Sequence, residues 1–185
     1  MRVISFQQCN VGGIIIDRRY VAIDVETSGI STLRGSRVIE VAAVEIRDGK
    51  ISAEFSSMIN VECVIHPAAA RVHGITRRML RDAPGAEEVW RIFLEFADNS
   101  PLIAHNASFD TGFIRSELSI LGLSLPNSSI CTLGLARKRF PRLESHRLEA
   151  VARHLLGGIP ADFRLHRALD DARLAALVWV ALNDL

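Results

Sequence analysis

Apolar and polar residues alternate in the first third of the chain, and this period of two predicts strands. Residues 18–29, "RRYVAIDVETSG", indicate a strand that ends in a turn. Residues 37–60, "RVIEVAAVEIRDGKISAEFSSMIN", carry two further strand patterns on either side of Asp48 and Gly49. Because Asp-Gly is a strong two-residue turn signal, the pattern predicts a hairpin.

The spacing of apolar residues becomes helical in the middle of the chain. In residues 83–100 they recur every three or four positions, which predicts an amphipathic helix. The short apolar run "PLIAH" that follows indicates a buried strand. Residues 106–122 then predict another helix, with Asn106 as its N-cap and Gly122 as its stop.

The last third of the chain is predicted to be mostly helical. Helices are expected around residues 132–139, 145–155 and 167–183, with a loop before the last one. Strands that come first, followed by helices with one strand among them, fit an α/β layer fold with a mixed sheet. Residues 1–18 fit no clear element, although Ile14–Ile16 could form a strand extension.

Composition narrows the class of protein. The 185 residues suit one domain of ordinary size, and 49% of them are apolar, so a sizeable core is expected. No apolar run is long enough to span a bilayer, and the first residues lack the pattern of a signal peptide. We therefore expect a cytoplasmic protein with no membrane partner.

Cysteines and charge exclude some further classes. Cys9, Cys63 and Cys131 are scattered without CxxC spacing, which argues against a disulfide framework or a structural zinc site and favours free thiols. The formal net charge of +1 gives no global basic field for nucleic acid. It leaves open an enzyme with a local positive rim.

Two carboxylates interrupt the first predicted strand. Since side chains alternate along a strand, Asp24 and Glu26 share the face opposite to Val21, Ile23 and Val25. The carboxylates would lie about 6.5 Å apart by backbone rise. Like charges that are partly buried raise each other's pKa, and a divalent cation between them would remove the repulsion. The alternative is a solvated pair at the end of a strand.

Two later aspartates lie on or beside apolar helix stripes. Asp110 is one turn from Phe113, and Asp171 is in register with Leu174. The alternative for Asp110 is that it is simply a first-turn aspartate, which the helix macrodipole favours. His166, five positions before Asp171, is placed to reach whatever that aspartate binds. Asp170 differs from Asp171, because Arg173 lies three positions on, a spacing at which helix side chains meet, and gives it a local ionic partner.

Oxygen ligands without cysteine point to Mg²⁺ or Mn²⁺ rather than zinc. Four carboxylates can hold two ions about 3.5–4 Å apart. That arrangement suits phosphodiester hydrolysis, in which one ion lowers the pKa of a water and the other supports the leaving oxygen.

Four motifs in order resemble a known family. "AIDVETSG", "VHGIT", "LIAHNASFD" and "HRALDDA" are similar in order and spacing to those of the DnaQ-like 3′–5′ exonucleases of the DEDDh class. That family includes the proofreading epsilon subunit of bacterial DNA polymerase III. The resemblance covers residues 19–182. It implies an RNase H-like fold, with a central mixed sheet of about five strands flanked by helices. Residues 19–185 would form a single exonuclease domain, and residues 1–18 an N-terminal extension.

The resemblance also implies roles for the acidic residues. Asp24, Glu26, Asp110 and Asp171 would be the catalytic carboxylates that bind two Mg²⁺ or Mn²⁺ ions, and His166 the general base.

Substrate contacts follow from the same motifs. Thr27, Ser28 and Gly29 would pack against the terminal nucleotide, while His73 and Asn106 match positions near the substrate. Alternative readings of the last two are a turn-forming histidine and a helix cap, and both kinds of role can hold together.

The expected activity is a stand-alone, metal-dependent 3′–5′ exonuclease that releases nucleoside 5′-monophosphates from the 3′ end of DNA, with single strands favoured. The alternatives are an exoribonuclease on short RNA or tRNA ends, an inactive nucleic-acid-binding member, and a domain associated with a DNA polymerase. DNA replication and repair are the implied processes.

Two features depart from the family pattern. Cys131 stands where many members carry Asp, which is not a catalytic position. The sequence stops at Leu185, without the tail by which the bacterial proofreading subunit reaches its polymerase. We therefore expect something other than a dedicated proofreading subunit.

Overall fold

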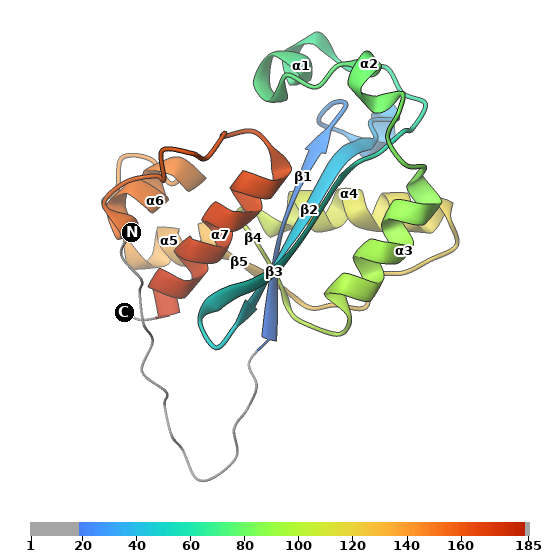
Figure 1. Ribbon diagram of the computed structural model, residues 1–185. Helices are drawn as coiled ribbons and strands as arrows, with labels where there is room; N and C mark the ends of the chain where they lie inside the picture. The colour runs from blue at the N-terminus through green and yellow to red at the C-terminus, as the bar shows by residue number, and fades with distance from the viewer. Residues whose placement is uncertain (1–18, 184–185) are drawn as a thin grey trace.

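The computed structural model describes residues 19–183, in which a twisted sheet is covered by helices on both faces (Figure 1). In chain order the elements are β1 (Arg19–Thr27), the 3₁₀ helix η1 (Thr32–Arg34), β2 (Val38–Arg47), β3 (Lys50–Met58), α1 (Pro67–His73), α2 (Arg77–Leu80), α3 (Ala86–Ala97), β4 (Leu102–Ala104), α4 (Ala107–Ile120), β5 (Ser129–Cys131), α5 (Thr132–Arg139), α6 (Leu148–Leu156) and α7 (Ala168–Asn183).

The sheet is mixed, with strand order β3-β2-β1-β4-β5. β1 pairs antiparallel with β2, and β2 with β3, while β4 and β5 run parallel to β1. The β2–β3 turn has positive φ at Asp48 (49°) and at Gly49 (75°), as expected for an Asp-Gly hairpin. The mixed sheet and the hairpin confirm the predicted fold class.

The two faces of β1 bury different cores. Val21, Ile23 and Val25 belong to the cluster that includes Trp90 of α3 and Ile114 of α4. The opposite face carries small residues, and α7 packs on it through a row of alanines: Ala22, Ala42, Ala168, Ala172 and Ala176. Small side chains on both surfaces let α7 approach the sheet closely, which places the start of α7 beside the carboxyl end of β1.

The structure adds elements that the sequence patterns missed. η1, α1, α2 and the edge strand β5 were not predicted, because each has at most seven residues and little periodicity. The helix expected at residues 145–155 begins only at Leu148, since Ser145 accepts a hydrogen bond from the backbone N–H of Arg147 in a turn. Gly122 lies two residues after the end of α4 with a φ of 68°, as predicted for its stop.

Some expectations fall outside residues 19–183. The extension and the Ile14–Ile16 strand lie there, as does Cys9, and the proposed domain boundary stays a prediction. Cys63 and Cys131 are free thiols, as expected. Among the residues that the structure describes, no helix combines the length and apolar character needed to cross a membrane.

Candidate metal centre

Three carboxylates from two elements meet at the carboxyl end of β1. Asp24 and Glu26 project from the α7 side of the strand, and Asp171 lies in the first turn of α7. One ligand atom from each lies within 4.8 Å of the other two. Oxygen atoms at this separation can share a hard divalent cation.

Asp110 forms the fourth part of the cluster. It lies in the first turn of α4 and is only 4% exposed, as its place beside the apolar stripe predicted. Its charge is close enough to raise the pKa of Asp24. The sheet therefore brings together Asp24, Glu26, Asp110 and Asp171, whose positions span almost 150 residues of sequence.

Burial and mutual repulsion raise the pKa of every carboxyl group in the cluster. For Asp24 the pKa lies well above its usual range because of burial, followed by the charges of Asp110 and Asp171. Burial raises the pKa of Glu26 to about 8 and that of Asp110 to about 7. That of Asp171 rises to about 6, also chiefly by burial. Without a cation the protein holds these groups in a site that disfavours their charged forms, and a bound cation would reverse this preference.

Arg167 lowers the pKa of Glu26, but less than burial and the neighbouring carboxylates raise it, and another carboxylate already binds this arginine. Glu40 of β2 lies opposite Glu26 and is 6% exposed. It accepts hydrogen bonds from the Arg167 guanidinium, two of them at 3.1 and 3.2 Å, and one from the backbone N–H of Ala168 at 3.1 Å. The sequence analysis missed Glu40. The signal was a lone carboxylate within the apolar run "VIEVAAV", which needs a buried partner.

His166 stands at the rim of the cluster. Its backbone N–H donates to Asp171 Oδ2 at 3.0 Å, and its φ of 61° is unusual for a residue other than glycine. The ring is exposed, with Nε2 3.8 Å from Oε1 of Glu149 in α6. The loop thus holds His166 beside Asp171. Glu149 is a second neighbour of His166 that no pattern in the sequence pointed to.

The two adjacent aspartates of α7 have different partners. Asp170 accepts a hydrogen bond from Arg173 at 2.8 Å, as its spacing predicted, and another from the backbone N–H of Arg164 at 2.9 Å. Asp171 has no cationic side chain as a hydrogen-bond partner among residues 19–183. Only Asp171 joins the carboxylate cluster.

The segment after β1 is fixed against the body of the protein. Thr27, Ser28 and Gly29 are buried. Ser28 accepts the backbone N–H of Arg37 on its hydroxyl and that of His66 on its carbonyl. A Cβ on Gly29 would lie 2.7 Å from the Ser36 hydroxyl, so a larger residue here would force Ser36 to move. A rigid backbone at the edge of the cluster is suited to packing against a ligand.

The structure supports the alternative reading of His73 as a turn-forming residue, but not that of the Asn106 side chain as a helix cap. His73 is 7% exposed, and its Nδ1 accepts the backbone N–H of Ile75 at 2.9 Å, which confirms the turn-forming reading. Its buried Nε2 has no hydrogen-bond partner in the described part of the chain. Asn106 does precede α4, but the helix-cap reading is wrong for its side chain. Its φ of 85° is left-handed rather than extended, so the exposed amide makes no capping bond.

The fold and the four carboxylates agree with the comparison to known families. The family model "Exonuclease" matches residues 21–179. The chain therefore belongs to the exonuclease family, and its similar structures are 3′–5′ exonucleases of the DEDDh class with the RNase H-like architecture.

Relatives in bacteria are longer proteins. The chain is 39% identical to the PolC-type DNA polymerase III of Clostridium perfringens over 160 residues, which are 86% of this chain and 11% of that protein. It is 35% identical to a DNA polymerase III subunit epsilon-like protein of Rhodobacter capsulatus over 165 residues, 88% of this chain and 23% of the relative. The chain thus spans a small part of the length of these relatives.

Two solved structures show the same fold. Exonuclease X in complex with 5′ overhanging duplex DNA gives a TM-score of 0.72 at 29% identity, covering 89% of this chain and 91% of the other. The nuclease domain of 3′hExo, a DEDDh family member bound to rAMP, gives 0.77 at 16% identity, with 93% and 94% covered. The acidic cluster fits the divalent metal ions that this family generally uses.

Proposed function

We propose that the chain removes nucleoside 5′-monophosphates from the 3′ end of DNA, with two Mg²⁺ or Mn²⁺ ions at the cluster of Asp24, Glu26, Asp110 and Asp171. The convergence of these carboxylates carries the proposal, because Arg167, whose charge also acts on Glu26, is already bound by Glu40. When bound, the ions would supply charge neutralisation for the phosphoryl oxygens and a more acidic attacking water.

The side chains around the cluster would transfer the proton and hold the terminal nucleotide. His166 takes the proton of the attacking water, since its loop is held to Asp171 and its ring is open to solvent. The buried segment Thr27–Gly29 holds the terminal nucleotide against β1. His73, at the end of α1, supports that segment near the substrate through the backbone of Thr27.

We place DNA first among the substrates because of what similar proteins are named for or were solved with. Exonuclease X, at 29% identity, was solved with DNA, and the PolC-type relatives are DNA polymerases by name. The rAMP-bound structure is only 16% identical and supports the fold alone. We therefore place DNA first and short RNA ends second. The preference for single-stranded 3′ ends is a separate prediction.

Association with a DNA polymerase is proposed for the same reason. Relatives of this chain are named as DNA polymerase III proteins, in which the similar region is a small part of the whole. Co-purification of the chain with a replicative polymerase would test this partner. A cytoplasmic location stays a prediction.

The activity is tested with single-stranded DNA, duplex DNA and RNA of matched sequence, each labelled at the 5′ end. We expect a descending ladder from DNA in Mg²⁺ or Mn²⁺, release of mononucleotides, and no activity in chelator. Faster degradation of RNA than of DNA would favour the exoribonuclease alternative. Full activity in chelator would reject the metal mechanism, and binding without hydrolysis in either metal would favour an inactive member.

A further inference from the structure

The end of α5 and the loop that follows it carry an exposed cationic surface outside the carboxylate cluster. Residues 137–147 hold five arginine or lysine side chains and one carboxylate, a formal net charge of +4 in a chain whose total is +1. All five cationic residues are exposed. We call this surface the basic face, and its members are Arg137, Lys138, Arg139, Arg142 and Arg147.

The charges of the basic face are not used inside the protein. None of the five side chains forms an ion pair with any residue between 19 and 183. Three arginines elsewhere in the chain, Arg37, Arg167 and Arg173, each bind a carboxylate instead. An arginine cluster without internal partners suits an external polyanion, because guanidinium groups match phosphate oxygens.

A hollow lies within the basic face. Its volume is about 550 Å³, and it is lined by Arg139, Phe140, Arg142 and His154 together with Pro141 and Leu143. The rings of Phe140 and His154 meet edge to face with their centroids 4.7 Å apart. An aromatic side chain between two arginines is suited to a nucleobase, with its phosphates on the arginines.

The basic face is continuous with the metal centre. His105, directly after β4, contacts Thr132 Oγ1 at 2.9 Å and the carbonyl of His146 at 2.8 Å. These contacts fix the start of α5 and the residue before Arg147 to the sheet edge where the carboxylates lie. Glu149, in the first turn of α6, lies 3.8 Å from His166. The basic face therefore begins at the rim of the site and extends away from it along α5.

The length of α5 sets how many nucleotides of a bound strand the basic face could contact. The eight residues of α5 rise about 12 Å along the helix. That distance corresponds to about four stacked nucleotides, at about 3.4 Å each. Arg139, at the far end of α5, would thus meet phosphates roughly four nucleotides before the 3′ end.

We propose that the basic face binds the sugar-phosphate backbone of the substrate strand upstream of its 3′ end, with a base in the hollow beside Phe140. The direction of the strand rests on the proposed function. Binding itself does not, since charge, hollow and continuity with the site are independent of catalysis.

The test compares two triple variants that remove the same charge. Lys138→Gln/Arg139→Gln/Arg142→Gln changes the basic face, and Lys50→Gln/Arg91→Gln/Arg115→Gln changes β3, α3 and α4, which lie away from it. Figure 1 shows α5 and α6 on the opposite side of the molecule from α3. All six residues are exposed, and equal melting temperatures would show that both variants fold.

Binding is measured by fluorescence anisotropy in chelator, with labelled single-stranded DNA of about 10 and about 3 nucleotides, a range set by typical single-strand sites. For the longer strand, we expect the plot of log K against log salt to be less steep for the basic-face variant, by about 2 units of slope. This corresponds to a loss of affinity of about 100-fold at 0.1 M salt. The trinucleotide and the control variant should change by no more than a few-fold. A double variant, Arg137→Gln/Arg147→Gln, should give about 25-fold by the same relation.

Hydrolysis separates this inference from the proposed function. With a nitrophenyl ester of a nucleoside 5′-monophosphate, the basic-face variant should match the wild-type rate in Mn²⁺. Wild-type affinity of both basic-face variants for the longer strand would overturn the inference. An equal loss of affinity in the control variant would also overturn it, because the effect would then come from the overall positive charge of the protein and not from the basic face. Loss of binding as expected, with no hydrolysis of any substrate by the wild type, would reject the proposed function and support the basic face.

Discussion

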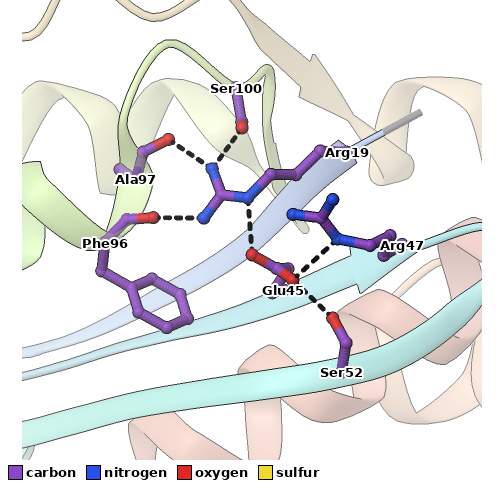
Figure 2. Close-up of polar contacts among 7 residues, drawn as sticks. All are labelled: Arg19, Glu45, Arg47, Ser52, Phe96, Ala97 and Ser100. Carbon is purple, nitrogen blue, oxygen red and sulfur yellow. Dashed lines mark hydrogen bonds and ion pairs between the residues drawn. The ribbon is translucent and has the colours of Figure 1, made fainter. Parts of the chain in front are cut away.

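The two ends of β1 treat charge in opposite ways. At the first residue, the Arg19 guanidinium binds Glu45, the Ser100 hydroxyl and the carbonyls of Phe96 and Ala97 (Figure 2). Five residues on, Asp24 belongs to a cluster of carboxylates without a cation of its own. At the Arg19 end of β1 the charged groups are paired with one another, and we call it the complete end. At the Asp24 end the carboxylates are not paired with cations, and we call it the incomplete end.

The direction of the pKa shifts follows this difference. Hydrogen bonds from Ser52, then from Arg19 and Arg47, lower the pKa of Glu45 to about 2 despite partial burial. Burial and neighbouring carboxylates instead raise the pKa of Glu26 to about 8. Both residues lie in the same strand pair, so the sheet itself does not decide the sign. The partners do, and the incomplete end is the one where an external cation would bind.

The largest effect should come from the asymmetry between Asp171 and Asp170. Asp171→Asn keeps an oxygen for the His166 backbone but removes a metal ligand. We expect the rate to fall by about 10⁴-fold, since a metal ion supplies several kcal/mol of transition-state stabilisation and each ~1.4 kcal/mol is tenfold. Asp170→Asn is the matched control and should keep most activity. Exonuclease rates and the Mn²⁺-induced rise in melting temperature measure both, and the reverse result would show that Asp170 is the ligand.

Removing the histidine at the rim should have the next largest effect. His166→Asn is preferred to His166→Ala because asparagine tolerates the positive φ found here. We expect a rate loss of about 10²–10⁴-fold, the usual contribution of a general base. Stabilisation by Mn²⁺ should persist, because the ring is outside the carboxylate cluster. Near wild-type turnover would rule out the role of His166 as the base.

The incomplete end should destabilise the metal-free protein at neutral and alkaline pH. A carboxyl group whose folded pKa is raised, such as Glu26 at about 8, holds extra protons in the folded state, so stability is lost as pH rises from about 4.5 through about 8. In chelator, we expect the melting temperature to fall across this window, and Mn²⁺ to restore it.

Asp24→Asn should invert that effect. At pH 8 in chelator it should stabilise the protein and raise its Tm, because burial and the neighbouring carboxylates hold the pKa of Asp24 well above its usual range. For this chain length each kcal/mol gained corresponds to about 2–4 °C in Tm. In Mn²⁺ the same variant should be less stable than the wild type. Glu144→Gln, an exposed carboxylate on the loop before α6, is the control and should change neither value. A destabilised Asp24→Asn protein in chelator would contradict the account.

The smallest effect should come from breaking the complete end. Glu45→Gln should cost about 1–3 kcal/mol of stability, as for a hydrogen bond to a charged group, and leave activity unchanged. Because the folded pKa of Glu45 is lowered, its contribution is present above pH 4.5 and lost as pH falls toward 2. The wild type and the variant should therefore converge in acid. Glu54→Gln, in the more exposed pair with Arg173, should cost less than about 1 kcal/mol.

Local patterns predicted much of the fold because they report on one element at a time. The alternation in β1 assigned Val21 and Asp24 to opposite faces, and Asp48-Gly49 located the hairpin. Asp110 was placed beside a buried stripe, and the structure buries it. The spacing of Asp170 from Arg173 separated the two neighbouring aspartates, since three residues along a helix bring side chains together.

The sequence by itself therefore determined the faces of the strands, the helix stripes and the carboxylates that were candidates for the site. Only the tertiary structure decided which charges are already satisfied. Glu40 binds Arg167 across 127 positions, and Arg19 finds its carbonyl partners 77 and 78 positions away. Such pairs depend on how α7 and α3 pack on the sheet, and no local period carries that information. Whether a buried carboxylate faces an arginine or another carboxylate is settled only when distant elements meet.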